Sequence, residues 1–195
     1  MTEKILVVVL FTLFIFNKSR LTKGIHRLDK IPGTVYHRWN TKLIYALYFI
    51  PFFLSPAEYI AMGRSINYPL SFTFLAVYAA GLELSRRARK TLDRYWTVNI
   101  EIRENHPLIK DGPYRYMRHP HYLYTYIELF SLPLIAGAYY TFILTALVFI
   151  PLLTLRIIYE EKEMVRKLGE GYLEYKRQVW GVFPFPLFKK GLSGE

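Results

Sequence analysis

The chain has 195 residues, of which 52% are hydrophobic and 17% are aromatic, and its formal net charge is +11. An ordinary soluble domain carries less apolar material, so this composition favours a membrane protein. The absence of cysteine excludes disulfides, thiolate nucleophiles and cysteine-held zinc or iron–sulfur centres. Positive charge alternates with the apolar blocks, which indicates contact with an anionic membrane face and argues against a nucleic-acid partner.

Apolar blocks in the first half predict three membrane-spanning helices. The block Ile5–Phe16 is shorter than the ~20 residues of a perpendicular span, so we expect its helix to extend by a turn at each end. A signal peptide fits less well, because neither a basic start nor a small-residue cleavage site flanks the block. The block Leu43–Met62 contains two prolines and predicts a kinked helix. Only Gly63–Asn67 separates it from the third block, Ile66–Leu84, so these two helices are expected to form a hairpin.

The run Tyr122–Tyr159 is almost continuously apolar, which is too long for one crossing at ~1.5 Å per residue. Pro133 and Ala136–Ala138 are the natural place for a turn. The prediction is therefore a short fourth helix, a longer fifth helix that ends with Arg156, and an all-α integral membrane protein with about five spans.

Lysine and arginine alternate between rich and poor loops. Seven lie in Lys18–Lys42, one is Arg64, nine lie in Arg86–Arg118, none lies in the fourth turn, and eight lie from Arg156 onward. The positive-inside rule then places the N-terminus outside and the first loop, third loop and C-terminus in the cytoplasm. The membrane would be the cell membrane of a prokaryote or the endoplasmic reticulum of a eukaryote.

No internal repeat, low-complexity tract or linker divides the chain, so residues 1–195 are expected to form a single multi-pass domain. Residues 1–84 would hold the three N-terminal spans. Residues 85–195 contain most of the chemically informative side chains, and a monomer is expected.

Two segments of this second part indicate a binding site. His106–Tyr122 has turn chemistry at Asp111–Pro113, and its apolar residues interleave with tyrosines, which favours a pocket for a flat ligand. A belt of tyrosine and arginine that anchors the membrane surface is the alternative. Further on, Arg156 and Glu160 share a helix face, whereas Glu161 lies about 100° around. One interpretation of Arg156 and Glu160 is a simple ion pair. The alternative is a ligand site, in which the two carboxylates bind an ammonium group and the arginine binds an anion.

Several other kinds of site are excluded or weakly supported. The chain has no glycine-rich nucleotide loop, no nucleophile elbow and no zinc-binding helix motif. His119 and His121 could chelate a metal, but Pro120 separates them and no carboxylate stands at helical spacing, so no metal is predicted. A haem carrier would need histidines that face each other inside membrane spans, whereas the histidines of this chain lie in or beside loops.

Three motifs follow one another in the C-terminal half: Gly112-x-Tyr114-x-x-x-Arg118-His119-Pro120-x-Tyr122, Glu160-Glu161, and Leu168-Gly169-Glu170-x-Tyr172-x-x-Tyr175. In order and spacing they resemble the isoprenylcysteine carboxyl methyltransferase family. The wider superfamily also contains phospholipid N-methyltransferases, so the motifs are less specific about the methyl acceptor.

The resemblance implies S-adenosylmethionine as the methyl donor, S-adenosylhomocysteine as the product, and a cytoplasmic pocket built by the C-terminal half without a metal. Glu160 would bind the methionine ammonium, and Asn99 falls at a further cofactor position with a poorer match. The implied cofactor-binding residues are His106, Pro107, Leu108, Ile109, Tyr114, His119, Pro120, His121, Tyr122 and Glu160.

The resemblance also implies an acceptor site in which Arg156 orients the carboxylate of a prenylated cysteine. Such a carboxylate already carries its nucleophilic lone pair and needs no strong base. If the acceptor were the amine of phosphatidylethanolamine, His119 or Glu161 would become the candidate base. The predicted catalytic residues are therefore Arg156 and Glu161, and the predicted partners are a prenylated substrate and membrane lipids.

Two non-enzymatic alternatives stay open at this stage. A membrane scaffold that binds lipid could keep this architecture without catalysis. A small transporter is suggested by Glu58, Glu83 and Glu128 in or near the spans, although five helices without repeat symmetry argue against it.

Overall fold

The computed structural model describes residues 33–97, 99–103 and 107–183, together with Val7, Phe11, Thr12 and Phe14. The rest of the first predicted helix and the predicted site residue His106 lie outside the described residues. In chain order the elements are β1 (Gly33–Tyr36), α2 (Arg38–Tyr48), α3 (Ile50–Met62), α4 (Tyr68–Leu92), η2 (Asp93–Tyr95), β2 (Ile100–Arg103), η3 (Gly112–Arg115), α5 (Pro120–Ile135), α6 (Tyr139–Leu168) and α7 (Glu170–Gln178).

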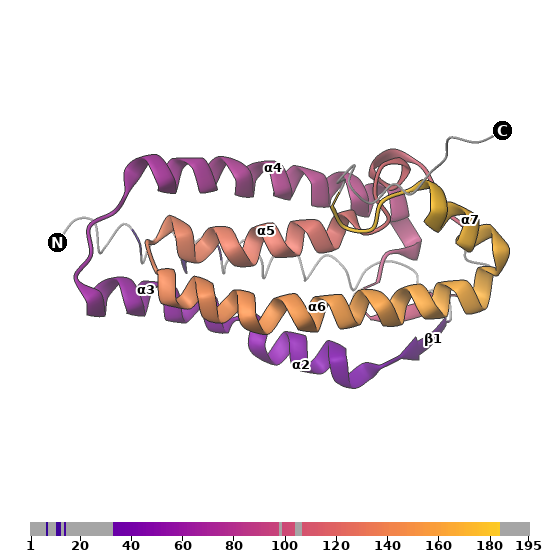
Figure 1. The fold of residues 1–195 in the computed structure, drawn as a ribbon, viewed down its shortest axis with the longest axis horizontal. Helices are drawn as coiled ribbons and strands as arrows, with labels where there is room; N and C mark the ends of the chain where they lie inside the picture. Colours follow the sequence, from indigo (N-terminus) through magenta and orange to yellow (C-terminus); the bar gives the residue numbers. More distant parts are fainter. Residues whose placement is uncertain are drawn as a thin grey trace.

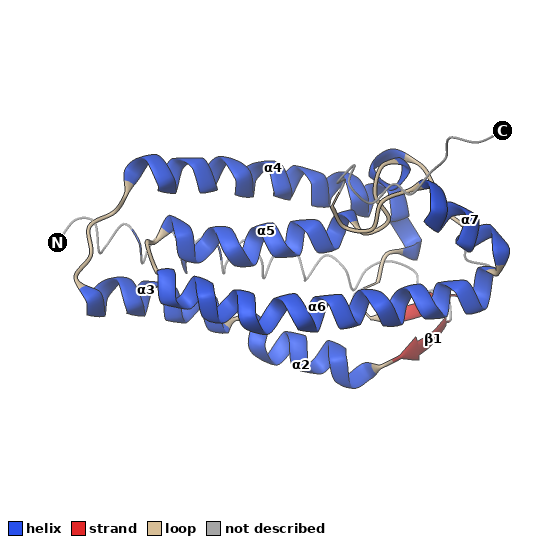
Figure 2. Ribbon diagram, viewed as in Figure 1, coloured by secondary structure: helices blue, strands red, loops and turns tan. Residues whose placement is uncertain are grey.

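The described part of the chain is mainly an array of long helices (Figure 2). Helix α5 contacts α4 on one side and α6 on the other, and α3 packs on α5 and α6 (Figure 1). The turn Gly63–Asn67 joins α3 to α4 as predicted, but α5 lies between these two helices. The expected hairpin is therefore open, because α5 packs against both α3 and α4.

The kink predicted in the second apolar block is confirmed. Helices α2 and α3 are separated at Phe49, and Pro51 lies in the first turn of α3, where a missing N–H breaks no helical hydrogen bond. Pro56 lies inside α3. Among the described residues, Arg38–Met62 and α6 are the two helical stretches long and apolar enough to cross a membrane.

The turn predicted within the last apolar run is also confirmed. Ala136–Ala138 separates α5 from α6, whereas Pro133 lies inside the last turn of α5. Helix α6 does not end at Arg156 as expected but continues to Leu168. Glu160 and Glu161 are therefore on the same continuous helix as Arg156, which fixes the relative directions of the three side chains.

Glu58 connects three elements at the end of the bundle where α6 begins. Its carboxylate pairs with Arg64 at 3.0 Å and accepts the backbone N–H of Tyr140 at 3.1 Å and of Thr141 at 2.7 Å. These N–H groups belong to the first turn of α6, where helical donors have no partner within the helix. Glu58 thus acts as a capping residue supplied by another helix.

We expect Glu58→Ala to lower the free energy of unfolding by about 1–2 kcal/mol, because the first turn of α6 loses its acceptor. Thermal unfolding of the purified protein measures this. Glu83→Gln is the matched control, since Glu83 is half exposed and pairs with the neighbouring Arg86 and Arg87 of its own helix. Equal unfolding temperatures for the two variants would contradict the capping role.

The other two acids that suggested a transporter also have local partners. Glu128 is 1% exposed and accepts hydrogen bonds from the hydroxyls of Tyr48 and Tyr124, the second at 2.7 Å. Glu83 accepts from Arg87 at 2.9 Å. The three acids therefore have structural contacts, and the transporter hypothesis loses the observation that supported it.

A short antiparallel ribbon is an element that the sequence did not indicate. Strand β1 pairs with β2 over four residues, with Tyr36 opposite Ile100. Four-residue strands are too short to give a clear alternating pattern. The ribbon ties the beginning of α2 to the segment that follows α4, and so brings the N-terminal half next to the site described below.

Two glycines allow α4 to approach its neighbours closely. A Cβ on Gly81 would lie 2.8 Å from Cγ2 of Ile127 on α5. Gly112 has a positive φ of +55°, and a Cβ there would lie 2.6 Å from Oγ1 of Thr91. Gly112 thereby sets η3, which carries Tyr114, against the end of α4.

Candidate functional site

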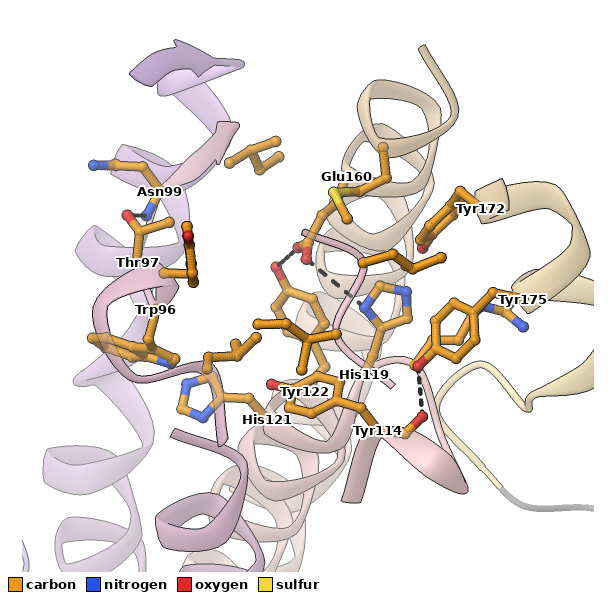
Figure 3. Close-up of a pocket in the computed structure, with 17 residues that line it drawn as sticks. Trp96, Thr97, Asn99, Tyr114, His119, His121, Tyr122, Glu160, Tyr172 and Tyr175 are labelled. Atoms are coloured by element: carbon orange, nitrogen blue, oxygen red, sulfur yellow. Dashed lines mark hydrogen bonds and ion pairs between the residues drawn. The ribbon is translucent and has the colours of Figure 1, made fainter. Parts of the chain in front are cut away.

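A pocket, drawn in Figure 3, is lined by residues of α7 and of the loop before α5. Figure 1 shows these segments at one end of the bundle. The segment before α5 and the second half of α6 meet there. The lining residues are Leu92, Tyr95, Trp96, Thr97, Asn99, Ile100, Leu108, Ile109, Tyr114, Arg118, His119, His121, Tyr122, Glu160, Met164, Tyr172 and Tyr175.

Most of the predicted cofactor-binding residues line this pocket, and Asn99 does so as well. They are Leu108, Ile109, Tyr114, His119, His121, Tyr122 and Glu160. Pro107 and Pro120 are not among the lining residues, and Pro120 is the buried first residue of α5. The catalytic candidates Arg156 and Glu161 are also absent from the lining.

Sequence reasoning assigned no role to several residues that line the pocket. Tyr172 and Tyr175 are three positions apart on α7 and so share a face, a signal that was present in the third motif. Trp96 comes from the segment between η2 and β2 and has no periodic neighbour that would reveal it. Its position depends on the ribbon, which folds that segment over the pocket.

Glu160 directs its carboxylate into the pocket (Figure 3). The Tyr122 hydroxyl donates to Oε2 at 2.5 Å, and Nδ1 of His119 lies 4.0 Å from Oε1. The side chain is 34% exposed, so it retains room for a further donor. A ligand that carries a positive charge or N–H donors would suit this carboxylate.

Glu161 lies instead in a buried network behind the pocket. It accepts from Nη2 of Arg118 at 2.8 Å, from Nζ of Lys176 at 2.6 Å, and from Nε2 of His119 at 3.1 Å. Arg118 and His119 belong to the loop before α5, whereas Lys176 belongs to α7. Glu161 therefore joins three segments that form the pocket wall.

We expect Glu161→Gln to destabilise the fold by about 3 kcal/mol, because a neutral amide cannot compensate the largely buried guanidinium of Arg118 or pair with the ammonium of Lys176. Chemical denaturation of the purified protein tests this. Glu174→Gln is a suitable control, since Glu174 is exposed and accepts a hydrogen bond from Gln178 one turn away. A loss no larger than that of the control would exclude the structural role.

The chain beyond α7 runs back along this loop. The N–H of Arg118 donates to the carbonyl of Trp180 at 2.7 Å, and the N–H of His119 donates to Gly181 at 3.1 Å. The Tyr175 hydroxyl donates to the carbonyl of Tyr114 at 2.6 Å. These contacts hold the loop backbone and so fix the side chains that project from it into the pocket.

Three pocket tyrosines outside the apolar helices, Tyr114, Tyr172 and Tyr175, are neutral. Burial raises the pKa of Tyr114 and of Tyr172 far above the ordinary value, and burial raises the pKa of Tyr175 to about 12. Each ring keeps its proton at physiological pH and offers an uncharged face. Neutral aromatic faces close to a carboxylate suit a ligand that combines a flat ring with positive charge.

Arg156 lies on the other side of the Tyr122 hydroxyl from Glu160. Its side chain is 5% exposed, and its Nε donates to that hydroxyl at 2.8 Å. Its Nη1 donates to Oγ1 of Thr41 at 2.8 Å and to Oδ1 of Asn40 at 3.3 Å, both on α2. Tyr122 thus bridges a carboxylate in the pocket and a guanidinium next to α2.

The two histidines of the middle motif have different partners. His119 faces the glutamates of α6, whereas Nδ1 of His121 lies 3.2 Å from Oγ of Ser85 on α4. No group of three histidine, aspartate or glutamate side chains within the described ranges is placed to hold a metal ion. The pairing of His119 with His121 in a chelate therefore has no support in the geometry.

Comparison with known proteins gives a consistent family assignment. The model of the isoprenylcysteine carboxyl methyltransferase family matches residues 74–166. Protein-S-isoprenylcysteine O-methyltransferase B of Arabidopsis thaliana is 30% identical over 153 residues, which are 75% of this chain and 78% of the relative.

Two further relatives match over shorter lengths. Protein-S-isoprenylcysteine O-methyltransferase of Schizosaccharomyces pombe is 32% identical over 81 residues, 42% of this chain and 34% of the relative. The uncharacterised protein YpbQ of Bacillus subtilis is 35% identical over 74 residues, 38% of this chain and 44% of the relative. The chain thus spans less than half the length of these two relatives.

Proposed function

The chain belongs to the isoprenylcysteine carboxyl methyltransferase family, and we propose that it uses S-adenosylmethionine to methylate the C-terminal carboxylate of an isoprenylated cysteine at the cytoplasmic face of a membrane. One observation carries the proposal. The Tyr122 hydroxyl lies 2.5 Å from Glu160, which faces the pocket, and 2.8 Å from Arg156, which is outside it. The site proposed for a cationic donor and the site proposed for an anionic acceptor would thus lie on the two sides of one phenol.

The lining residues fit the parts of S-adenosylmethionine, which when bound supplies an electrophilic methyl group on a sulfonium. Glu160 would accept from the methionine ammonium. The faces of Trp96 and Tyr114, with Leu108 and Ile109 beside them in the lining, would hold the adenine ring. His119 and His121 would close the same wall. The resemblance also assigns Pro107 and Pro120, which do not line the pocket, and His106, which lies outside the described residues, to the cofactor.

Arg156 would bind and orient the acceptor carboxylate without accepting a proton, since guanidinium stays charged in proteins. Tyr122 accepts a hydrogen bond from Nε of Arg156 at 2.8 Å and would thereby fix the position of the guanidinium relative to the pocket. Alignment of the reacting groups and exclusion of water would supply most of the acceleration, effects worth up to ~7–11 kcal/mol. The site therefore needs no strong base.

The position of Glu161 favours a carboxylate acceptor over the amine of phosphatidylethanolamine. An ammonium must lose a proton before it can attack, so an amine acceptor needs a base such as Glu161 or His119. Glu161 is held by Arg118 at 2.8 Å and by Lys176 at 2.6 Å, and these cations stabilise its charged form against protonation. We assign Glu161 to positioning the loop and not to proton transfer.

Membrane insertion would bring the two substrates together. Five spans, with the N-terminus outside and the C-terminus in the cytoplasm, would place the pocket beside the cytosol, from which the polar donor arrives. The prenyl chain of the acceptor would stay in lipid. Large apolar side chains that are exposed on α3 and α6 would face that lipid: Ile50, Phe53, Leu54, Ile60, Met62, Tyr139, Tyr140, Ile143, Leu144, Leu147 and Ile150.

Calorimetric titration of S-adenosylhomocysteine into the detergent-purified protein tests the donor half of the proposal. We expect one site with micromolar affinity. No heat of binding to protein that unfolds cooperatively would contradict the enzymatic function and favour the non-catalytic, lipid-binding scaffold.

A further inference from the structure

Asn40 is a buried residue of α2 whose side chain is only partly satisfied. It is 0% exposed, and its Oδ1 accepts from Nη1 of Arg156 at 3.3 Å. Within residues 33–97, 99–103 and 107–183, its Nδ2 has no hydrogen-bond partner. A buried amide N–H without an acceptor is unfavourable, so a native structure that keeps one calls for an explanation in the bound state.

The backbone around Asn40 is held in place by an unusual residue. His37 has a left-handed φ of 48°, and its carbonyl accepts the N–H of Asn40 at 3.0 Å. Its ring stacks on Tyr159 of α6 with 3.9 Å between ring centroids and 7° between planes. Tyr159 is one turn from Arg156. His37 is thus a strained residue that packs on α6, the helix that also carries Arg156. This packing indicates that the position of Asn40 relative to Arg156 is constrained.

We propose that Asn40 is a substrate-binding residue whose Nδ2 donates to the carboxylate of the methyl acceptor, beside the guanidinium of Arg156. The inference rests on the proposed function and adds a contribution from the N-terminal half to the acceptor site. A carboxylate has two oxygens that accept several hydrogen bonds, so one can face Arg156 while the other takes the amide N–H. The unpartnered donor and the buried cation then both gain an acceptor.

The same pair of donors selects against an amine acceptor. An ammonium group offers only N–H donors, so it would leave Nδ2 of Asn40 unpaired and would stand close to the charge of Arg156. A site built to hydrogen-bond one ligand group discriminates strongly against a ligand that lacks it. Asn40 is therefore a specificity-determining residue for acidic acceptors.

Equilibrium binding of two prenyl-cysteine probes, one a free acid and the other its methyl ester, tests this in the full-length protein without cofactor. We expect the wild type to bind the acid at least about tenfold more tightly than the ester. Asn40→Leu removes the donor, and Asn40→Asp keeps an acceptor for Arg156 but replaces the donor by a negative charge. Both should lower this acid-to-ester ratio by at least about fivefold, while the contribution of Arg156 remains.

Asn67→Asp is the matched control, because Asn67 caps α4 by accepting from the N–H of Leu70 and aspartate caps equally well. It should keep the acid preference. The affinity for S-adenosylhomocysteine, measured on the same samples, should stay at the wild-type value in all variants and shows that each one is folded.

The inference is overturned if the wild type binds acid and ester equally, or if a folded Asn40 variant retains the full wild-type acid-to-ester ratio. It is also overturned if a prenyl monophosphate, but not the acid, binds in an Asn40-dependent manner, since the donors would then serve a phosphate. Absence of S-adenosylhomocysteine binding by the wild type would contradict the methyltransferase itself, which is a different failure.

Discussion

Replacing Arg156 with alanine is expected to reduce methyl transfer by about a thousandfold or more, while the affinity for S-adenosylhomocysteine changes by less than about threefold. The expectation follows from the separation of the two sites. Arg156 is not among the pocket-lining residues, and its Nε donates to the hydroxyl of Tyr122, which does line the pocket. Loss of the guanidinium would leave the acceptor carboxylate without its partner and misaligned. Initial rates with a prenyl-cysteine acid and calorimetry with S-adenosylhomocysteine measure the two quantities.

Arg156→Lys is the matched variant for this prediction. Lysine keeps the charge but cannot contact Tyr122, Thr41 and a substrate in the same plane, so we expect activity between those of the wild type and the alanine variant. Retained turnover in Arg156→Ala would remove the arginine from the acceptor site. A large loss of S-adenosylhomocysteine affinity would instead mean that Arg156 shapes the donor pocket.

Glu160→Gln is expected to weaken S-adenosylhomocysteine binding by about ten- to a hundredfold. Hydrogen bonds to a charged group contribute about 1.5–3 kcal/mol, and each 1.4 kcal/mol corresponds to a factor of about ten. The amide keeps the shape of the side chain but loses the charge that would face the ligand ammonium. Calorimetric titration gives the dissociation constant directly.

Glu163→Gln provides a control on the same helix. Glu163 is buried on the side of α6 that faces His37, with 4.0 Å between its Oε1 and Nε2 of that ring, and it does not line the pocket. We expect its substitution to leave the affinity unchanged, even where stability falls. An unchanged dissociation constant in Glu160→Gln would refute the assignment of the ammonium site.

The helical framework was predictable from the sequence because its signals are local. Apolar blocks predicted the helices, the prolines of the second block predicted the break near Phe49, and Ala136–Ala138 predicted the turn between α5 and α6. The order of the helices in space was not predictable in this way. The insertion of α5 between α3 and α4 depends on packing between segments that are far apart in the chain.

The site was predictable to the extent that its residues follow fixed spacings. Helical periodicity separates Glu160 from Glu161, so one faces the pocket and the other faces Arg118. The resemblance assigned Glu160 to the cofactor, but the partners of Glu161, Arg118 and Lys176, required the structure. Asn40 and Trp96 were not predicted at all, because the ribbon of β1 and β2 brings them to the site and neither strand has a recognisable pattern.

The most direct test of the account is the chemical identity of the methylated product. Protein reconstituted in vesicles would be given methyl-labelled S-adenosylmethionine, a prenyl-cysteine acid and phosphatidylethanolamine together. We predict that the label enters the prenyl-cysteine as a methyl ester, which alkali hydrolyses to volatile methanol. Alkali-stable label in the phospholipid, or no transfer by protein that binds S-adenosylhomocysteine, would contradict the proposed reaction.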